Sequence, residues 1–279
     1  MHDIYYENSM GERLNLLEYP YCMQTADLFD YEWGYETKFS GNNSYGIKNF
    51  SQGTRTKEIR MTIAGCTEQD FFANVDRFFD AVNYDVLNGQ CGRLWFGEYY
   101  LKCYIVGAKK EGWEEDCGFS DEVLAIVTDY PFWIRETEKI FMIREIQEED
   151  RNTIDYPHDY PYDFTASLTS DEIMNETNDT LEFEFNIFGP CDSPKIIIGR
   201  HGYRVNAVLE TDEYLVVNSV TRKIYKVKID GEKVNQYSLK DEDSYIFQKI
   251  PPGMSIVSWD NSFGFSVLLI ERRITPRWI

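Results

Sequence analysis

The last hundred residues form an almost unbroken series of β-strand patterns, and this feature limits the possible folds most strongly. Between Leu181 and Trp278, short apolar runs recur roughly every ten residues, with turn residues between them. Asp230-Gly231 is a strong two-residue hairpin signal. This pattern predicts an all-β sandwich or jelly roll. The predicted strands are LEFEFNIFG, PKIIIG, YRVNAV, YLVVNS, KIYKVKI, SYIFQKI, MSIVSW and FGFSVLLIE.

The first half of the chain contains one clear helix pattern, in TEQDFFANVDRFFDAVNYDVLNG. Thr67 and Asp70 resemble an N-capping pair, and Asn88-Gly89 predicts a turn after the helix. Apolar residues at helical spacing predict one buried face. They are Phe71, Phe72, Val75, Phe78, Phe79 and Val82.

Strand patterns surround this helix. GRLWFGEYYLKCYIVGAKKEG predicts a hairpin that turns at Gly97-Glu98, and VLAIVTDYPFWI predicts a buried strand ended by Pro131. Earlier, YEWGYETKF and KEIRMTIAG alternate like strands on either side of Ser40–Gly53, which is rich in Gly, Asn and Ser. We therefore predict a long loop or arm there, inside an α+β domain.

The composition changes between Arg144 and Phe164, where REIQEEDRNTIDYPHDYPYDF is charged and rich in Tyr, Asp and Pro. Proline cannot donate to a strand ladder, so we interpret this segment as a linker. The predicted organisation is an N-terminal α+β domain at 1–140, a linker or strap at 141–165 and an all-β domain at 166–279.

The chain carries 48 acidic and 28 basic residues, a net charge of −20. Such a chain repels a phosphate backbone, so we expect no sequence-specific nucleic-acid binding. A conduit through which DNA slides without binding stays compatible with this charge. No signal-peptide core and no membrane-spanning apolar run is present, which predicts a soluble protein made in a cytoplasm and no membrane insertion.

No residue is predicted to be catalytic, to bind a cofactor or to bind a metal. The cysteines form no C-x-x-C pair, and no histidine cluster accompanies them. Neither a P-loop nor a G-x-S-x-G motif is present, and we interpret His201 as a loop residue. The cysteines, expected to be reduced, are Cys22, Cys66, Cys91, Cys103, Cys117 and Cys191, and the other histidines are His2 and His158.

Two alternatives stay open from the residues alone. A sandwich with exposed aromatic side chains can bind sugars, and a wall hydrolase needs two close carboxylates, which DYPHDYPYDF or ETDEY would supply. The aromatic candidates for a sugar platform are Tyr203, Tyr214, Tyr225, Tyr237 and Trp259.

Ordered motifs along the chain resemble the distal tail (Dit) family of long-tailed phages and prophages. In the second half they are the segment FNIFGPCDSPKIIIGRHGYRVNAV, the turn Ile250–Met254 and the closing motif Glu271–Trp278. In the first half, LLEYPYCMQTADLFDYEWGYE, the aromatic helix and GRLWFGEYYLKCYI match in the same order. Met254 departs from the family, in which an Asn is common at that place.

This resemblance implies a structural virion protein, not an enzyme, at the distal end of a phage tail. Six copies would form a ring through their N-terminal domains around a channel for DNA, and a galectin-like β-sandwich would follow. The implied partners are the tail tube protein, the tape-measure protein, the tail-tip or tail-associated lysin protein and, in some members, a receptor-binding protein. Arg272, Arg273 and Arg277 are candidates for pairing with acids of the first domain or of a neighbouring copy. The alternative function is a carbohydrate-binding module that contacts host cell-wall saccharide.

Overall fold

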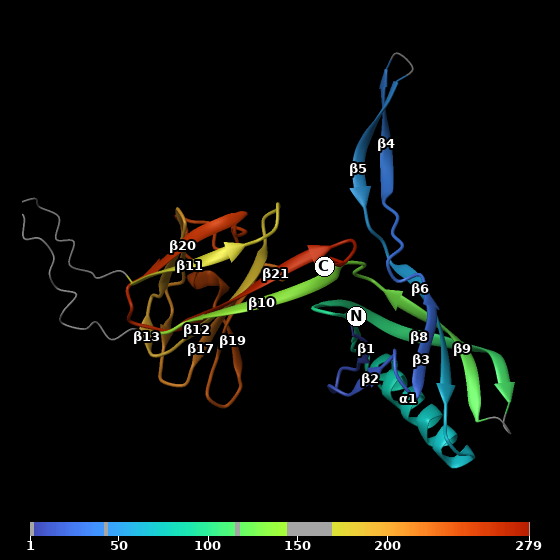
Figure 1. Cartoon of the computed structure of the whole chain (residues 1–279). Coiled ribbons are helices and arrows are strands. Elements are labelled where there is room, and N and C mark those ends of the chain that lie inside the picture. Colours follow the sequence, from blue (N-terminus) through green and yellow to red (C-terminus); the bar gives the residue numbers. More distant parts are fainter. Residues whose placement is uncertain (1–2, 42–43, 115–117, 144–168, 279) are drawn as a thin grey trace, which may run out of the picture. The chain divides into compact units, whose positions relative to one another are not determined.

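The chain is mostly β, with several antiparallel sheets and, among the described residues, one α-helix (Figure 1). It divides into two compact units. The first contains Met1–Arg135 and Arg272–Ile279, and the second contains Glu136–Glu271. Residues 272–279, which were predicted to belong to the all-β domain, therefore group with the first unit. The computed structural model describes residues 3–41, 44–114, 118–143 and 169–278.

Most of the predicted linker, from residue 144 to 165, lies outside the described residues. Two strands, β10 (Trp133–Phe141) and β21 (Phe265–Arg273), carry the chain across the division between the units. Phe141, which we had placed in the linker, ends β10 and is buried in the core of the second unit.

The first unit is built on a strand that belongs to two sheets. The early residues of β8 pair with β7 and β10, and its later residues, from Tyr104 onward, pair with β9. β7 continues to β1 and β2, whereas β9 continues to β6 and β3. The strands are β1 (Ile4–Glu7), β2 (Arg13–Asn15), β3 (Tyr21–Ala26), β4 (Gly34–Gly41), β5 (Ser44–Ser51), β6 (Arg55–Ala64), β7 (Gly92–Phe96), β8 (Tyr99–Glu114) and β9 (Phe119–Thr128).

The predicted helix is confirmed as α1 (Glu68–Asn88). Thr67 caps its first turn by accepting a hydrogen bond from the Asp70 amide at 3.1 Å, and Gly89 ends it with φ 61°, where glycine is favoured. Phe78 and Val82 are buried in the core of the first unit, as the spacing predicts. Phe72 was wrongly placed on this face: it is 39% exposed, because it lies about 100° around the helix from Phe71.

Of the predicted turn at Gly97-Glu98 and the predicted loop over 40–53, only the turn is formed as expected. The hairpin is confirmed, since Phe96 pairs with Tyr99 across Gly97-Glu98 and Gly97 has φ 57°. The loop predicted over 40–53 is wrong for Ser44–Ser51, which is the strand β5 and pairs with β4. Its Gly, Asn and Ser content suggested a loop, but its backbone pairs with that of β4 on both sides of a register shift.

The second unit contains two larger sheets whose side chains share one core. One sheet has the order β19-β18-β17-β12-β21, and the other has the order β11-β20-β14-β15. Phe183 and Phe185 of the first sheet and Ile196 and Val257 of the second belong to that core and are fully buried. The strands are β11 (Thr169–Asn175), β12 (Glu182–Phe188), β13 (Cys191–Asp192), β14 (Lys195–Ile198), β15 (His201–Arg204), β16 (Val208–Leu209), β17 (Tyr214–Asn218), β18 (Lys223–Val227), β19 (Lys233–Asn235) and β20 (Gly253–Trp259).

The strand predicted over SYIFQKI is not formed. Ile246, Phe247 and Ile250 are buried in the core, so the apolar signal is real, but two of them are adjacent and do not alternate. The carbonyl groups of this segment accept hydrogen bonds from side chains instead of a ladder: Tyr203 donates to Gln248 at 2.7 Å. Only an isolated bridge, Leu181 to Ile250, is formed there.

Candidate assembly surface

A long two-stranded hairpin is the most exposed element of the first unit. We call β4 and β5 together, Gly34–Ser51, the arm. β4 and β5 pair only with each other, and the arm extends away from the sheets of its unit (Figure 1). Every residue of β5 is exposed.

The strand register gives the arm one apolar face. Tyr35 pairs with Phe50, and Phe39 pairs with Tyr45. Directly paired residues point to the same face of a ribbon. One extra residue in β5, at the register shift opposite Glu36 and Thr37, brings Phe50 back into phase with the residues nearer the tip. The apolar face of the arm consists of Tyr35, Thr37, Phe39, Tyr45, Ile47 and Phe50.

This face is large and lacks cover within the described chain. Tyr35, Phe39, Tyr45, Ile47 and Phe50 are 65%, 55%, 72%, 59% and 57% exposed. An isolated two-stranded hairpin is only marginally stable in water, and contiguous exposed apolar surface of this kind marks interaction sites.

The opposite face of the arm is polar. It carries Glu36, Lys38 and Lys48, and Lys48 Nζ lies 3.5 Å from the Glu36 carboxylate. Both partners are well exposed, so this ion pair adds little stability. The arm is thus an amphipathic ribbon with one face suited to protein contact and one suited to water.

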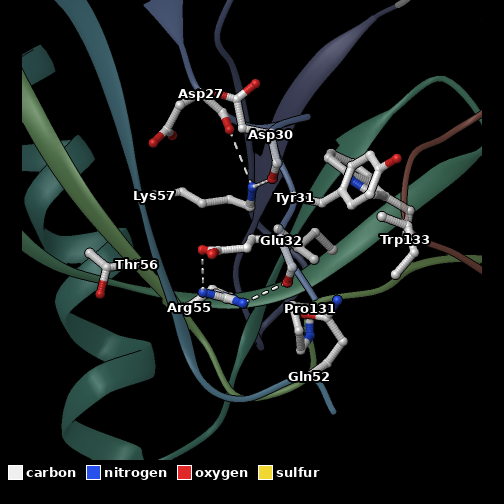
Figure 2. A pocket seen from close by; sticks show the side chains of 12 residues that line it. Asp27, Asp30, Tyr31, Glu32, Gln52, Arg55, Thr56, Lys57, Pro131 and Trp133 are labelled. Carbon is white, nitrogen blue, oxygen red and sulfur yellow. Dashed lines mark hydrogen bonds and ion pairs between the residues drawn. The ribbon is translucent and has the colours of Figure 1, made fainter. Parts of the chain in front are cut away.

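Side-chain hydrogen bonds join the two chain segments at the root of the arm (Figure 2). Lys57 Nζ donates hydrogen bonds to the carbonyl oxygens of Asp27 at 3.2 Å and Asp30 at 2.6 Å. Arg55 donates to the Glu32 carbonyl oxygen at 2.6 Å. These bonds join the chain entering the arm to the chain leaving it, around a pocket of about 310 Å³. Burial lowers the pKa of Lys57, but its two carbonyl partners satisfy two of its protons.

The closing segment, residues 272–278, supplies side chains to the first unit. The ring of Trp278 lies 4.6 Å from that of Phe29 and 5.3 Å from that of Phe96, both in edge contacts. Arg272 Nη1 lies 2.7 Å from the Tyr130 hydroxyl and donates to it. Arg273 Nε donates to the Thr275 carbonyl oxygen at 3.1 Å. The pairing of Arg272, Arg273 and Arg277 with acids stays a prediction.

The described residues contain no group of three or more His, Cys, Asp and Glu side chains that could hold a metal. The interpretation of His201 as a loop residue is wrong, because it is the first residue of β15 and pairs with Ile198. Its ring makes a hydrogen bond to the Tyr245 carbonyl oxygen at 2.9 Å. In ETDEY, Glu213 pairs with Lys226 at 2.8 Å, and hydrogen bonds from the Glu210 amide and Lys226 lower its pKa, the opposite of what a general acid needs. DYPHDYPYDF, His2, His158 and Cys117 lie outside the described residues. The five described cysteines are free thiols.

The aromatic candidates for a sugar platform separate into two groups. Tyr203 and Trp259 are core residues, 3% and 1% exposed. Tyr214 and Tyr237 are 37% and 45% exposed, and Tyr225 is half-buried. Tyr225 and Tyr237 line one pocket of the second unit, which the sequence did not indicate.

No protein-family model matches the sequence, and no curated protein matches it. Solved structures do match. The Dit protein of phage SPP1, described as a paradigm of the hub adsorption apparatus of phages that infect Gram-positive bacteria, shares 11% sequence identity with a TM-score of 0.60. The match covers 98% of this chain and 99% of that one. The chain has a Dit-like fold.

A chain of the phage P2 baseplate, in its activated conformation with Ca, matches similarly. It shares 12% identity with a TM-score of 0.62, and the match covers 99% of this chain and all of that one. The likeness therefore spans both units and not a single shared domain. No helix of the described residues is both long and apolar enough to cross a membrane.

Proposed function

We propose that this chain is a distal tail protein of a phage or prophage, a structural component that forms a ring at the distal end of the tail. The observation that carries this proposal is the Dit-like fold over nearly the whole chain, together with an arm whose apolar face needs a partner. No arrangement of the described residues favours catalysis, and the proposed role is structural.

The arm is proposed to lie on the adjacent copy of the chain. Covering five large apolar side chains that are more than half exposed would bury on the order of 500 Å² of apolar surface. That area favours association by on the order of 12 kcal/mol before the entropic costs of binding. An arm reaching one neighbour makes a head-to-tail contact, which generates a closed ring when the rotation between copies closes.

Six copies and a central channel follow from the resemblance to the Dit family. The net charge of −20 suits this role, because DNA moving through a channel must not be held by its wall. The proposed partners are the tail tube protein, the tape-measure protein and the tail-tip or tail-associated lysin protein, with a receptor-binding protein in some assemblies. In this proposal the second unit is the galectin-like sandwich.

The first test is the mass of the purified chain, measured by light scattering behind a sizing column. A closed ring of six predicts about six times the chain mass of 32.9 kDa. Electron micrographs of the same fraction should show rings with six-fold symmetry. A dimer, an open-ended polymer or a monomer at every concentration would contradict a self-closing six-membered ring.

A further inference from the structure

The second unit has a basic pocket, although the chain as a whole is strongly acidic. The pocket has a volume of about 530 Å³ and lies where the β17–β18 turn, β18, β19 and the 3₁₀ turn Tyr237–Leu239 meet. This volume is within the range usual for small-ligand sites. Its lining includes Arg222, Lys223, Tyr225, Lys233, Asn235 and Tyr237.

The three cations that line the pocket make no ion pair among the described residues, although the Glu184 carboxylate lies nearby, where it accepts a hydrogen bond from the lining residue Asn218. Arg222, Lys223 and Lys233 line it, whereas Lys240 lines a neighbouring pocket together with Asp241, Glu242 and Asp243 and contacts the shared Tyr237 ring. By contrast, three other lysines of the second unit, Lys226, Lys228 and Lys249, each pair with a glutamate. Like charges close together repel one another, so a bound anion would stabilise the cluster.

Two tyrosine rings lie among these cations. Lys233 Nζ is 5.2 Å from the centre of the Tyr225 ring, and Lys240 Nζ is 4.9 Å from the centre of the Tyr237 ring. Lysine is flexible, so each ammonium group can leave its ring for an anionic ligand group while the ring contacts an apolar ligand face. The pocket thus offers flat apolar platforms with positive charge at their edges.

The backbone of the pocket is also unusual. Arg222 has φ 54°, in the left-handed region that favours glycine. Its turn is held by the Asn218 side chain, whose oxygen accepts a hydrogen bond from the Thr221 amide at 2.8 Å. The tight turn places the Arg222 side chain at the pocket, as part of its lining.

We propose that this pocket binds an acidic saccharide, a sugar chain that carries phosphate or carboxylate groups. The cations would pair with the anionic groups, and Tyr225 and Tyr237 would stack on the sugar rings. An acidic peptide would use the cations but has no need of the two ring faces, and a neutral sugar would leave the cations unused. The site lies within the second unit and does not depend on ring assembly.

The test is a titration of the full-length chain by calorimetry with four polymers of similar size. Oligogalacturonate carries carboxylates, phosphomannan carries phosphates, mannan is neutral and poly-glutamate is an acidic peptide. We expect at least one charged saccharide to bind about tenfold more tightly than both mannan and poly-glutamate. The comparison between the first two polymers identifies the anionic group. Equal binding of mannan or of poly-glutamate, or no binding of either charged saccharide, overturns the proposal.

Matched variants locate the site. Lys233→Gln should weaken binding about tenfold, whereas Lys228→Gln should leave it unchanged, because Lys228 pairs with Glu232 at 2.6 Å and does not line the pocket. Tyr237→Leu should weaken binding several-fold, and Tyr237→Phe should retain it, since the phenyl ring keeps the platform. Equal losses in Lys228→Gln and Lys233→Gln would indicate general charge attraction and overturn the assignment.

Discussion

Asp85 joins the helix to the first strands through a small buried network. Its carboxylate accepts hydrogen bonds from the Tyr6 hydroxyl, from the Ser9 amide at 2.8 Å and from the Ser9 hydroxyl at 2.6 Å. Gly92 is required beside it, because a Cβ there would lie 2.2 Å from the Tyr6 hydroxyl oxygen. A fully buried acid is stable only when its oxygens are satisfied in this way.

Replacing Asp85 with Ala should lower the free energy of unfolding by about 3 kcal/mol, because it leaves buried donors without an acceptor. Chemical denaturation followed by fluorescence measures this loss. Asp80→Ala is the matched control: Asp80 lies on the same helix but is exposed, and its loss should cost less than about 0.5 kcal/mol. Equal effects of the two variants would show that the network contributes nothing.

Because Tyr203 is buried, we expect the chain to lose stability in alkaline solution. Burial raises the pKa of its phenol above the value of about 10 in the unfolded chain. Above pH 10 the folded chain therefore keeps a proton that the unfolded chain loses. The protonated phenol contributes its full stability below pH 10, and above pH 10 the free energy of unfolding falls by about 1.4 kcal/mol per pH unit until the pKa of the folded state is reached.

Tyr203→Phe should accordingly lower stability at pH 8 by about 1 kcal/mol, the contribution of the hydrogen bond to Gln248. This deficit should disappear by about pH 11, because phenylalanine has no proton to lose. Denaturation curves of both proteins from pH 8 to pH 11 give the comparison. A constant deficit across this range would contradict the assigned direction of the pKa shift.

At the scale of elements, the helix can be predicted from its own segment of sequence, whereas the apolar face of the arm cannot. The helix has its cap, its turn residue and its apolar spacing within a single segment, so its bounds can be read from the sequence. The arm contains an extra residue in β5, which breaks the simple alternation of Tyr45, Ile47 and Phe50. A pattern search with period two keeps Tyr45 and Ile47 but loses Phe50, although the folded register places all three on one face.

Variants of the arm should affect assembly of the ring without affecting folding of the chain. Tyr45→Ser together with Ile47→Ser should abolish the high-mass form, and it should change the free energy of unfolding of the monomer by less than about 0.5 kcal/mol, because both side chains are exposed. Light scattering and thermal denaturation report the two effects.

Lys38→Ser, on the polar face of the same hairpin, is the control for this double variant and should assemble normally. If the variant of the polar face fails to assemble as well, or if the apolar variant keeps the full mass, the arm is not the contact between copies.

At the scale of the whole molecule, the closing segment stabilises a unit distant in sequence. Trp278→Ala should destabilise the first unit by about 1 kcal/mol, because it removes edge contacts with Phe29 and Phe96. Hydrogen exchange should quicken in β7, which carries Phe96, and stay unchanged in β12 of the second unit. Faster exchange in both strands, or in neither, would contradict this assignment.

Much of the fold could be predicted because the signals are local. LEFEFNIFG alternates strictly, and its Phe183, Phe185 and Ile187 are indeed buried. SYIFQKI failed because burial and strand pairing are different properties: its apolar residues enter the core while its backbone bonds to side chains. The pocket of the second unit could not be predicted, since Arg222, Lys233 and Tyr237 come together only through the β18–β19 pairing and the turn that follows it.

The sequence by itself determined the helix, most of the strands, the acidic charge and, through the order of its motifs, the resemblance to a family whose fold the chain shares. These properties depend on residues close together in the sequence or, for the charge, on the total over all residues. The tertiary structure alone decided the apolar face of the arm, the place of Trp278 in the first unit and the basic pocket. Each of these depends on strand register or on contacts between residues far apart in the chain, and a one-residue change of register would move every side chain of a strand to the other face.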